Sequence, residues 1–301
     1  MNKLVAIIAV FFCASVAAQP VRIATYQYAD NNRIANIQPF ADELKSKYAT
    51  EAVVKSYPTV HAFIEAIRND EVDIALINTF GYFLLEASGK SYPMRPLLAL
   101  EVGENARDNY KTAFLASPSS HIRSLEDIKA SATKTRLALV AKGSTSGNLV
   151  PRLALSHLGI PNAETSFKEV NYAGTHATAI DAILNNTADL ATMGLTEYQR
   201  YLVKDSANFR KLRLIWTSPE IPLGPVLFNK KLSAEQVLAI QKAFTELDER
   251  APAALSAIKS GWSEAKQATR FIAITDAFYD PFRKILGNKT DLERILRQFA
   301  E

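Results

Sequence analysis

A strand, a loop of small residues and a helix start follow one another in the segment Arg136-Leu137-Ala138-Leu139-Val140-Ala141-Lys142-Gly143-Ser144-Thr145-Ser146-Gly147-Asn148-Leu149-Val150-Pro151. The apolar run that ends at Val140 predicts a buried strand, because buried parallel strands carry short continuous apolar runs. Pro151 predicts the first turn of a helix, where the missing N–H donor of proline costs nothing. The segment is therefore a strand–loop–helix unit of an α/β fold.

The loop Gly143–Gly147 is the place where chemistry is expected. The N–H groups of a first helical turn have no partner within the helix, and the helix dipole makes that end positive. Three hydroxyls add donors, and glycine lets an oxyanion approach the backbone. The pattern predicts an anion cradle, and it equally fits a loop closed by an ordinary serine cap.

Two catalytic loop motifs are excluded by spacing. A nucleophile elbow requires a serine at the centre of Gly-x-Ser-x-Gly, where this chain has Thr145. A phosphate-binding P-loop requires Gly-Lys-Ser/Thr at its end, and Gly147 is followed by Asn148. We therefore expect binding at this loop, without nucleotide chemistry or acyl transfer.

The sequence on both sides continues the alternation of strands and helices. The expected strands cover Val21–Tyr26, Ala52–Tyr57, Asp73–Ile77, Arg95–Glu101, Lys111–Ala116, Phe167–Tyr172, Asp189–Thr192, Leu212–Trp216 and Val226–Asn229. Helical spacing of apolar residues falls between most of them, as in Ile37–Lys47, the helix capped by Thr59, and Ala177–Asn185. This order predicts parallel sheets that are covered by helices on both faces.

An internal repeat suggests two similarly built halves. Ala66-Ile67-Arg68-Asn69, followed after three residues by Asp73-Ile74-Ala75, recurs as Ala182-Ile183-Leu184-Asn185 and Asp189-Leu190-Ala191. The spacing between the copies is too long for a solenoid repeat and suits two α/β domains.

Two polar or proline-rich stretches mark the crossings between these domains. They are 101–110 and 218–225, and each separates two expected strands. We expect domain one to comprise residues 19–108 and 219–301, and domain two to comprise residues 109–218. The helices from Ser233 onward would return to domain one. Two crossings form a two-strand hinge, and a ligand would bind in the cleft that the hinge opens and closes.

Composition and charge are those of an ordinary globular protein. Of 301 residues, 48% are hydrophobic and 22% charged, which excludes a disordered, collagen-like or disulfide-stapled chain. The 35 Lys and Arg against 31 Asp and Glu give a formal charge of +4. Without clustered basic residues, this charge gives no reason to expect nucleic acid as a partner.

Residues 1–18 are expected to be a signal peptide. Lys3 precedes an apolar run from Leu4 to Cys13, and small residues stand where a signal peptidase cleaves after Ala18. The run is too short to span a membrane, so an exported, soluble, periplasmic protein is expected. Cys13, the single cysteine, leaves with this segment, so no thiol or disulfide chemistry is expected. A lipoprotein signal at Cys13 is disfavoured by Phe12, which stands where such signals have a small residue.

His176 and Glu197 are further candidates for the site. His176 falls in the first turn of a helix, where the dipole disfavours the imidazolium, so the free protein should hold it neutral. Glu197 follows an expected strand and suits either a helix start or a place facing a cation. The four histidines, at 61, 121, 157 and 176, have no metal-ligand spacing, so neither a metal nor another cofactor is expected.

Taken together, these residues resemble the phosphate, phosphite and phosphonate-binding proteins of ABC importers. The Ser144-Thr145-Ser146-Gly147-x-Leu149-Val150-Pro151 element is the specific part of the resemblance. It extends over the mature chain through Val72-Asp73-Ile74-Ala75, the Gly174…His176 turn and Ile215-Trp216-Thr217-Ser218-Pro219. The resemblance implies the two-lobed periplasmic binding protein fold, with two parallel-sheet α/β domains.

The resemblance also implies roles for residues. Ser144, Thr145, Ser146 and Gly147 would hold the phosphono oxygens, and Tyr110 and His176 would add donors. Tyr82 stands where many members have a tyrosine after the third strand. Glu197 matches one of the two acids that hold the amine in aminoethylphosphonate binders.

The chain departs from the family pattern at three places. Asn78-Thr79 stand where members usually have Gly-Pro or Gly-Asn after the third strand, and the other two departures bear on specificity. Val60 stands where many members have a ligand tyrosine, and Gly224 stands where the second amine-binding acid would be. A small oxyanion or an alkylphosphonate without a cationic group is therefore expected.

The expected function is reversible capture of a phosphorus oxyanion by a monomer, followed by delivery to a permease of the inner membrane. The alternative is a periplasmic sensor with the same fold that reports the anion to a histidine kinase. An enzyme, such as a hydrolase that uses His176 and a serine, is the least favoured interpretation.

Overall fold

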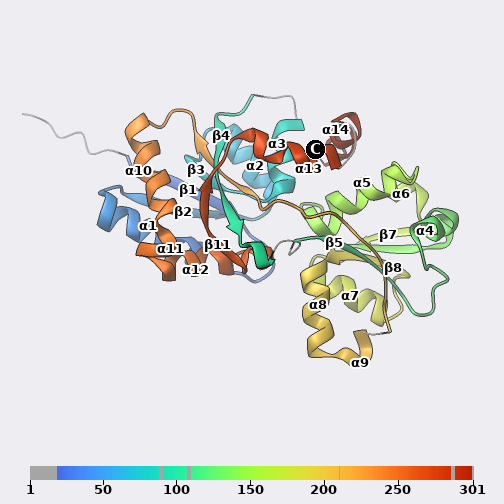
Figure 1. Ribbon diagram of the computed structural model, residues 1–301. Helices are drawn as coiled ribbons and strands as arrows, with labels where there is room; N and C mark the ends of the chain where they lie inside the picture. Colours follow the sequence, from blue (N-terminus) through green and yellow to red (C-terminus); the bar gives the residue numbers. More distant parts are fainter. Residues whose placement is uncertain (1–18, 88–90, 107–109, 210, 286–288, 300–301) are drawn as a thin grey trace, which may run out of the picture.

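The computed structural model describes residues 19–87, 91–106, 110–209, 211–285 and 289–299. It contains two β-sheets, each in its own lobe (Figure 1). The expected signal peptide and Cys13 lie outside the described residues. No helix in the described ranges is both long and apolar enough to cross a membrane.

The sheet of lobe one has the strand order β11-β4-β10-β3-β1-β2. Its strands are β1 (Val21–Tyr26), β2 (Ala52–Tyr57), β3 (Ile74–Leu76), β4 (Met94–Val102), β10 (Pro225–Asn229) and β11 (Ala268–Ala273). β1 is parallel to both β2 and β3, whereas β10 is antiparallel to β3 and β4, and β11 is antiparallel to β4. The apolar faces of this sheet require helices on both sides.

Helices cover both faces of this sheet. Residues of α1 (Arg33–Tyr48), α10 (Ala234–Thr245) and α12 (Pro252–Ser260) share one apolar cluster. Residues of α2 (Val60–Arg68), α3 (Thr79–Ala87), α13 (Asp280–Ile285) and α14 (Lys289–Arg297) share the other. The short α11 (Leu247–Arg250) links α10 to α12.

The sheet of lobe two has the order β7-β6-β8-β5-β9. Its strands are β5 (Thr112–Ala116), β6 (Arg136–Leu139), β7 (Glu169–Tyr172), β8 (Leu190–Gly194) and β9 (Arg213–Thr217). β6 is parallel to β7 and β8, and β5 is antiparallel to β8 and β9. The helices of this lobe are α4 (Leu125–Ser131), α5 (Val150–His157), α6 (Ala163–Ser166), α7 (His176–Leu184), α8 (Leu195–Lys204) and α9 (Ser206–Phe209).

The two-lobed α/β fold expected from the sequence is confirmed, with a difference in strand direction. Each sheet has a parallel core of three strands, extended by antiparallel strands that the alternating pattern did not reveal. Antiparallel strands enter because the chain passes from lobe one to lobe two after β4 and returns before β10. Strand β11 was also not predicted, because only helices are expected from Ser233 onward.

The internal repeat corresponds to a structural repeat. Strand β1 pairs with β2 and β3 as β6 pairs with β7 and β8. In each copy an arginine on the central strand braces the start of the next strand: Arg22 Nε donates to Asp73 Oδ2 at 2.9 Å, and Arg136 Nε to Asp189 Oδ2 at 3.1 Å. The two lobes are therefore variants of one architecture.

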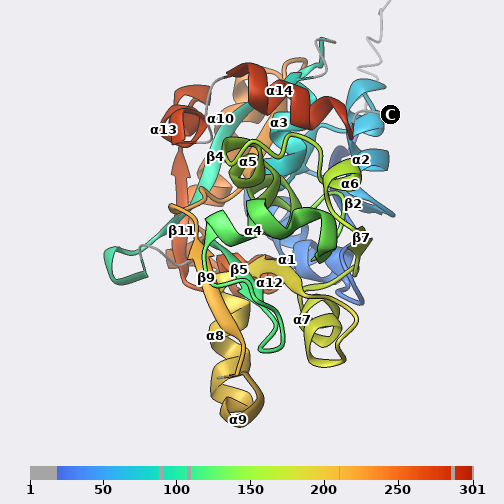
Figure 2. The same ribbon diagram turned by 90° about the vertical axis from the view of Figure 1, so that its right-hand side faces the viewer.

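The C-terminal helix α14 packs against both lobes (Figure 2). It contacts α3 of lobe one and α5 of lobe two. Leu149, Val150 and Leu153 of lobe two belong to the same apolar cluster as Leu292, Ile295 and Leu296 of this helix. Arg294 donates to Ser156 Oγ at 2.7 Å and to the Pro161 carbonyl at 3.0 Å. The lobes thus share buried apolar surface in addition to the two crossings.

The crossing strands are hydrogen-bonded to each other where they leave lobe two. The Ile221 N–H donates to the Tyr110 carbonyl at 2.7 Å, and the Ser218 N–H donates to the Thr112 carbonyl at 2.9 Å. Just beyond, Gly224 lies against β3: a Cβ there would be 2.0 Å from the Ile77 carbonyl oxygen and 2.6 Å from Asn78 Cα. No side chain fits at position 224 without movement of the backbone.

This close approach predicts the effect of a single methyl group. Gly224→Ala should lower the free energy of unfolding by about 2–3 kcal/mol, because overpacking forces backbone shifts. Gly103→Ala, on the other crossing, is the matched control: its Cβ would meet Thr269 Cγ2 at an ordinary 3.5 Å. The control should change stability by about 0.5 kcal/mol or less. Urea unfolding of both variants measures the difference, and equal effects would contradict the prediction.

Candidate functional site

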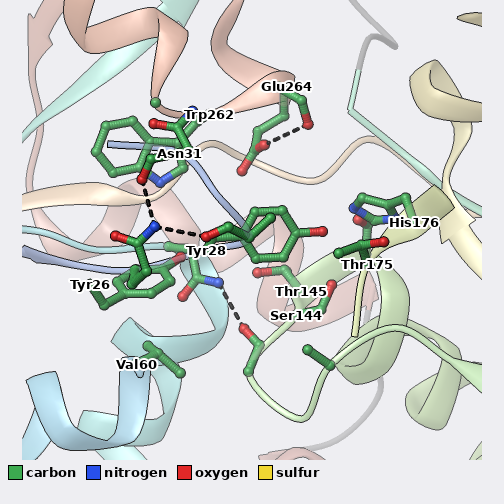
Figure 3. Close-up of a pocket in the computed structure, with 18 of the residues that line it drawn as sticks. Tyr26, Tyr28, Asn31, Val60, Ser144, Thr145, Thr175, His176, Trp262 and Glu264 are labelled. Carbon is green, nitrogen blue, oxygen red and sulfur yellow. Dashed lines mark hydrogen bonds between the residues drawn. The ribbon is translucent and has the colours of Figure 1, made fainter. Parts of the chain in front are cut away.

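A cavity of about 560 Å³ lies between the two lobes (Figure 3). It lies beyond the carboxyl ends of parallel strands in both sheets, where open α/β folds bind ligands. Lobe two lines it with Ala141, Lys142, Gly143, Ser144, Thr145, Ser146, Thr175, His176, Ala177, Glu197 and Tyr201. The lobe-one wall includes Tyr26, Tyr28, Arg33, Val60, His61, Asn78, Trp262 and Glu264, and Tyr110 comes from the crossing.

The loop predicted as an anion cradle forms one turn of π-helix over Thr145–Leu149, with Ser144 as its N-cap. Ser144 Oγ accepts the Gly147 N–H at 3.0 Å. The N–H groups of Thr145 and Ser146 precede this donor in the first turn, so no acceptor within the helix is available to them. These two amides and the hydroxyls beside them are the donors that the loop can offer a ligand.

The carbonyls of the same loop are held on its far side. Thr112 Oγ1 donates to the Ser146 carbonyl and Thr192 Oγ1 to the Gly147 carbonyl, both at 2.8 Å. Both threonines are completely buried, on β5 and β8. The loop is therefore fixed before any ligand arrives, because water cannot replace these two bonds.

The loop also meets lobe one directly. Thr145 Oγ1 accepts the Phe80 N–H at 3.0 Å, and the Gly143 carbonyl accepts Asn78 Nδ2 at 2.9 Å. Phe80 lies in α3 and Asn78 immediately before it, so both bonds cross from one lobe to the other. The Thr145 side chain thus has a structural partner in addition to any ligand.

Tyr110 lines the cavity beside the anion loop. It is buried, and this burial together with repulsion by Glu264 raises the pKa of its phenol, while hydrogen bonds with the Thr145 and Ser146 side chains act in the opposite direction. The phenol is therefore a neutral donor at any physiological pH.

His176 is the first residue of α7, and its side chain points into the cavity (Figure 3). Its Nδ1 accepts the Gly194 N–H at 3.2 Å, which leaves the proton of the neutral ring on Nε2. Burial lowers the pKa of His176 to about 4, against an opposing effect of Glu197. The imidazole is thus neutral near pH 7 and can donate from Nε2, in agreement with the sequence-based expectation.

Two carboxylates line the cavity, one on each lobe, and each interacts with an arginine. Glu197 forms an ion pair with Arg200 at 2.9 Å. Glu264 accepts from Ser263 Oγ at 3.4 Å, and burial raises its pKa while the charge of Arg33 lowers it. Arg33 itself is buried and lies over the Trp262 ring at 4.2 Å. The cavity therefore carries no uncompensated run of negative charge.

Two predicted site residues lie elsewhere. Tyr82 is completely buried in α3, where it packs on Tyr279 and its hydroxyl donates to Asp276; it does not line the cavity. Its position in the helix turns it toward η5 (Asp276–Tyr279) and away from the cleft. Gly147 lies behind the loop, where a Cβ would be 2.2 Å from Val140 Cγ2. It permits close packing of the loop on β6 and does not face the cavity.

Most of the lobe-one wall was not predicted from the sequence, above all Tyr28, Asn78 and Glu264. A usable signal exists for the first two: each follows a strand of the parallel core, as the anion loop itself does. Glu264 and Trp262 come from a segment after α12 that no motif marks. No cluster of three or more His, Cys, Asp or Glu within metal-binding reach occurs in the described parts of the chain.

Comparisons with known proteins show the family to which the chain belongs. Residues 24–279 match the family described as "ABC transporter, phosphonate, periplasmic substrate-binding protein". The phosphonates-binding periplasmic protein of Escherichia coli (strain K12) is 26% identical over 195 residues, which are 65% of this chain and 56% of that protein. The match thus spans little more than half the length of that relative.

Solved structures share the fold. A binding protein component of an ABC phosphonate transporter from Pseudomonas aeruginosa superposes with a TM-score of 0.68 at 22% identity, covering 94% of this chain and 96% of that one. PhnD1 of Prochlorococcus marinus (MIT 9301), solved in complex with methylphosphonate, gives a TM-score of 0.68 at 15% identity, covering 92% and 98%.

The buried state of His176 predicts a pH dependence of stability. An unfolded histidine binds a proton near pH 6.5, whereas folded His176 binds one only near pH 4. Between these values the unfolded state holds more protons, so His176 makes the protein less stable as the pH falls through this window. His176→Gln should flatten that part of the profile, as measured by urea unfolding at several pH values. Parallel profiles for the two proteins would refute the assignment.

Proposed function

Since this chain belongs to the phosphonate family of periplasmic substrate-binding proteins of ABC transporters, we propose that its cavity captures a small phosphorus oxyanion and delivers it to a permease of the inner membrane. The ligand class is a phosphonate, phosphite or phosphate. The family is one of transport proteins, so the proposed event is reversible binding in which no bond of the ligand breaks.

The observation that carries the proposal is the fixed set of donors on one side of the cavity. The residues that contribute these donors all line one cavity. The donors are the Thr145 and Ser146 amides, the three loop hydroxyls, the Tyr110 phenol and His176 Nε2. Micromolar affinity requires about 8 kcal/mol. Hydrogen bonds to a charged group contribute about 1.5–3 kcal/mol each, so four or five of these donors suffice after the costs of association.

Each donor has a proposed role. Ser144, Thr145 and Ser146 hold the anion oxygens from lobe two, and the positive end of the loop helix compensates the anion charge. Tyr110 donates from the crossing, which places one contact at the hinge. His176 donates from Nε2 as a neutral group, and a bound anion would raise the pKa of its ring.

Closure of the lobes is proposed to complete the site. The bonds from Asn78 and Phe80 to the anion loop cross the cleft, so the loop that holds the ligand also holds lobe one. A closed lobe one excludes water and strengthens every donor contact. The closed form is proposed to be the one that the permease recognises.

The affinity for methylphosphonate tests the loop. Thr145→Ala should weaken binding at least tenfold by calorimetry, because it removes one donor to the anion. It should also lower the melting temperature by a few degrees, since the buried Phe80 N–H loses its acceptor.

Thr145→Ser is the matched control for this experiment. It keeps the hydroxyl that serves both the ligand and Phe80, so its affinity should stay within a few-fold of that of the parent protein. If Thr145→Ala binds methylphosphonate as tightly as the parent, the loop is not the anion site.

The ligand substituent is tested by comparing methylphosphonate with aminoethylphosphonate. Glu197 is paired with Arg200 and Glu264 lies near Arg33, so neither carboxylate is reserved for an ammonium group. We expect the two affinities to differ by no more than about tenfold, or about 1.4 kcal/mol. A hundredfold preference for the amine that Glu264→Gln abolishes would overturn this expectation and identify Glu264 as an amine ligand.

A further inference from the structure

The hydroxyl of Tyr28 is an unexplained polar group in the cavity wall of lobe one. Tyr28 follows β1 and lines the cavity, yet its hydroxyl oxygen is buried and its hydroxyl proton has no acceptor among the described residues. A buried hydroxyl without a partner costs about 1–3 kcal/mol. Such a group in a native structure requires an explanation, and a missing ligand is one.

The surroundings of Tyr28 place it opposite the donors of lobe two. Its ring lies 6.3 Å from the His176 ring, centroid to centroid. Burial and the charge of Glu264 raise the pKa of Tyr28, whereas the His176 backbone N–H lowers it. The net effect is an increase, so the hydroxyl keeps its proton. Figure 3 shows Tyr28 between Glu264 on one side and Ser144 and Thr145 on the other. The hydroxyl thus faces the start of α7 across the cleft.

His176 connects Tyr28 to the anion loop. A Cβ atom at position 194, where the chain has glycine, would lie 3.5 Å from Ser146 Oγ and 3.8 Å from His176 Cε1. The imidazole is therefore near Ser146 as well as near the Tyr28 ring. An anion held by the loop and by His176 Nε2 would lie in the cavity that Tyr28 also lines.

We propose that Tyr28 is the lobe-one ligand of the captured anion, with its hydroxyl donating to one oxygen of the tetrahedral group. The proposal rests on the proposed function and adds a residue that binds the ligand from lobe one. Val60, whose methyl groups line the cavity at the start of α2, cannot donate there. Tyr28 supplies a phenol to the same wall from the neighbouring β1 loop.

A single-atom change tests the proposal. Tyr28→Phe keeps the ring and removes only the hydroxyl, so calorimetry with methylphosphonate and with phosphite should show at least tenfold weaker binding. Without ligand, the melting temperature should stay the same or rise, because the buried hydroxyl proton has no acceptor in the free protein. A purely structural role would instead lower the stability of the free protein.

Tyr57→Phe is the matched control from the same lobe. The Tyr57 hydroxyl donates to Glu71 at 3.1 Å outside the cavity, so its removal should lower stability slightly and leave affinity unchanged. If Tyr28→Phe binds both probes within twofold of the parent, or loses stability without ligand, the proposal is wrong. If Thr145→Ala still weakens binding in that case, the proposed function stands without Tyr28; if neither variant affects binding, the function itself fails.

Discussion

The donor face of the cavity depends on how the carbonyls of the anion loop are held behind it. Thr112 and Thr192, both completely buried on neighbouring strands, donate to the carbonyls of Ser146 and Gly147. The Thr145 and Ser146 amides share their peptide units with the carbonyls of Ser144 and Thr145. The Ser144 carbonyl accepts the Leu149 N–H at 3.1 Å, and the Thr145 carbonyl accepts the Val150 N–H. A peptide unit whose carbonyl is fixed in one direction has its N–H fixed in the other. The amides of the anion loop therefore face the cavity before a ligand enters, and the entropy of ordering them is already spent in folding.

The repeat of the fold explains why the two walls of the cavity differ. Strand β1 is the counterpart of β6, and the same arginine–aspartate brace holds both. The loop after β6 carries the hydroxyls and the π-helical turn, whereas the loop after β1 carries Tyr28 and leads into α1. One architecture thus yields a donor-rich wall on lobe two and a wall on lobe one that mixes aromatic rings with Arg33 and Glu264.

Local patterns in the sequence predicted the fold and the lobe-two wall because those features are local. The strand–loop–helix unit around Gly143–Gly147 lies within one short segment, and His176 opens the helix that follows the next strand of the parallel core. Tyr82 was misplaced because its direction depends on which face of α3 meets Tyr279, a contact between residues almost two hundred positions apart. Glu264 and the antiparallel strand β11 were missed for the same reason: their places are set by how the C-terminal segment returns to lobe one.

The packing of α14 constrains how the lobes can move. Leu149, Val150 and Leu153, which directly follow the anion loop, bury apolar surface against a cluster that includes this helix. A straight separation of the lobes would expose that surface to water at a cost of about 25 cal/mol per Å². A rotation about an axis near α14 would keep it covered. Opening of the cleft about such an axis would place the entrance for the ligand on the side remote from α14, with this helix beside the axis of rotation.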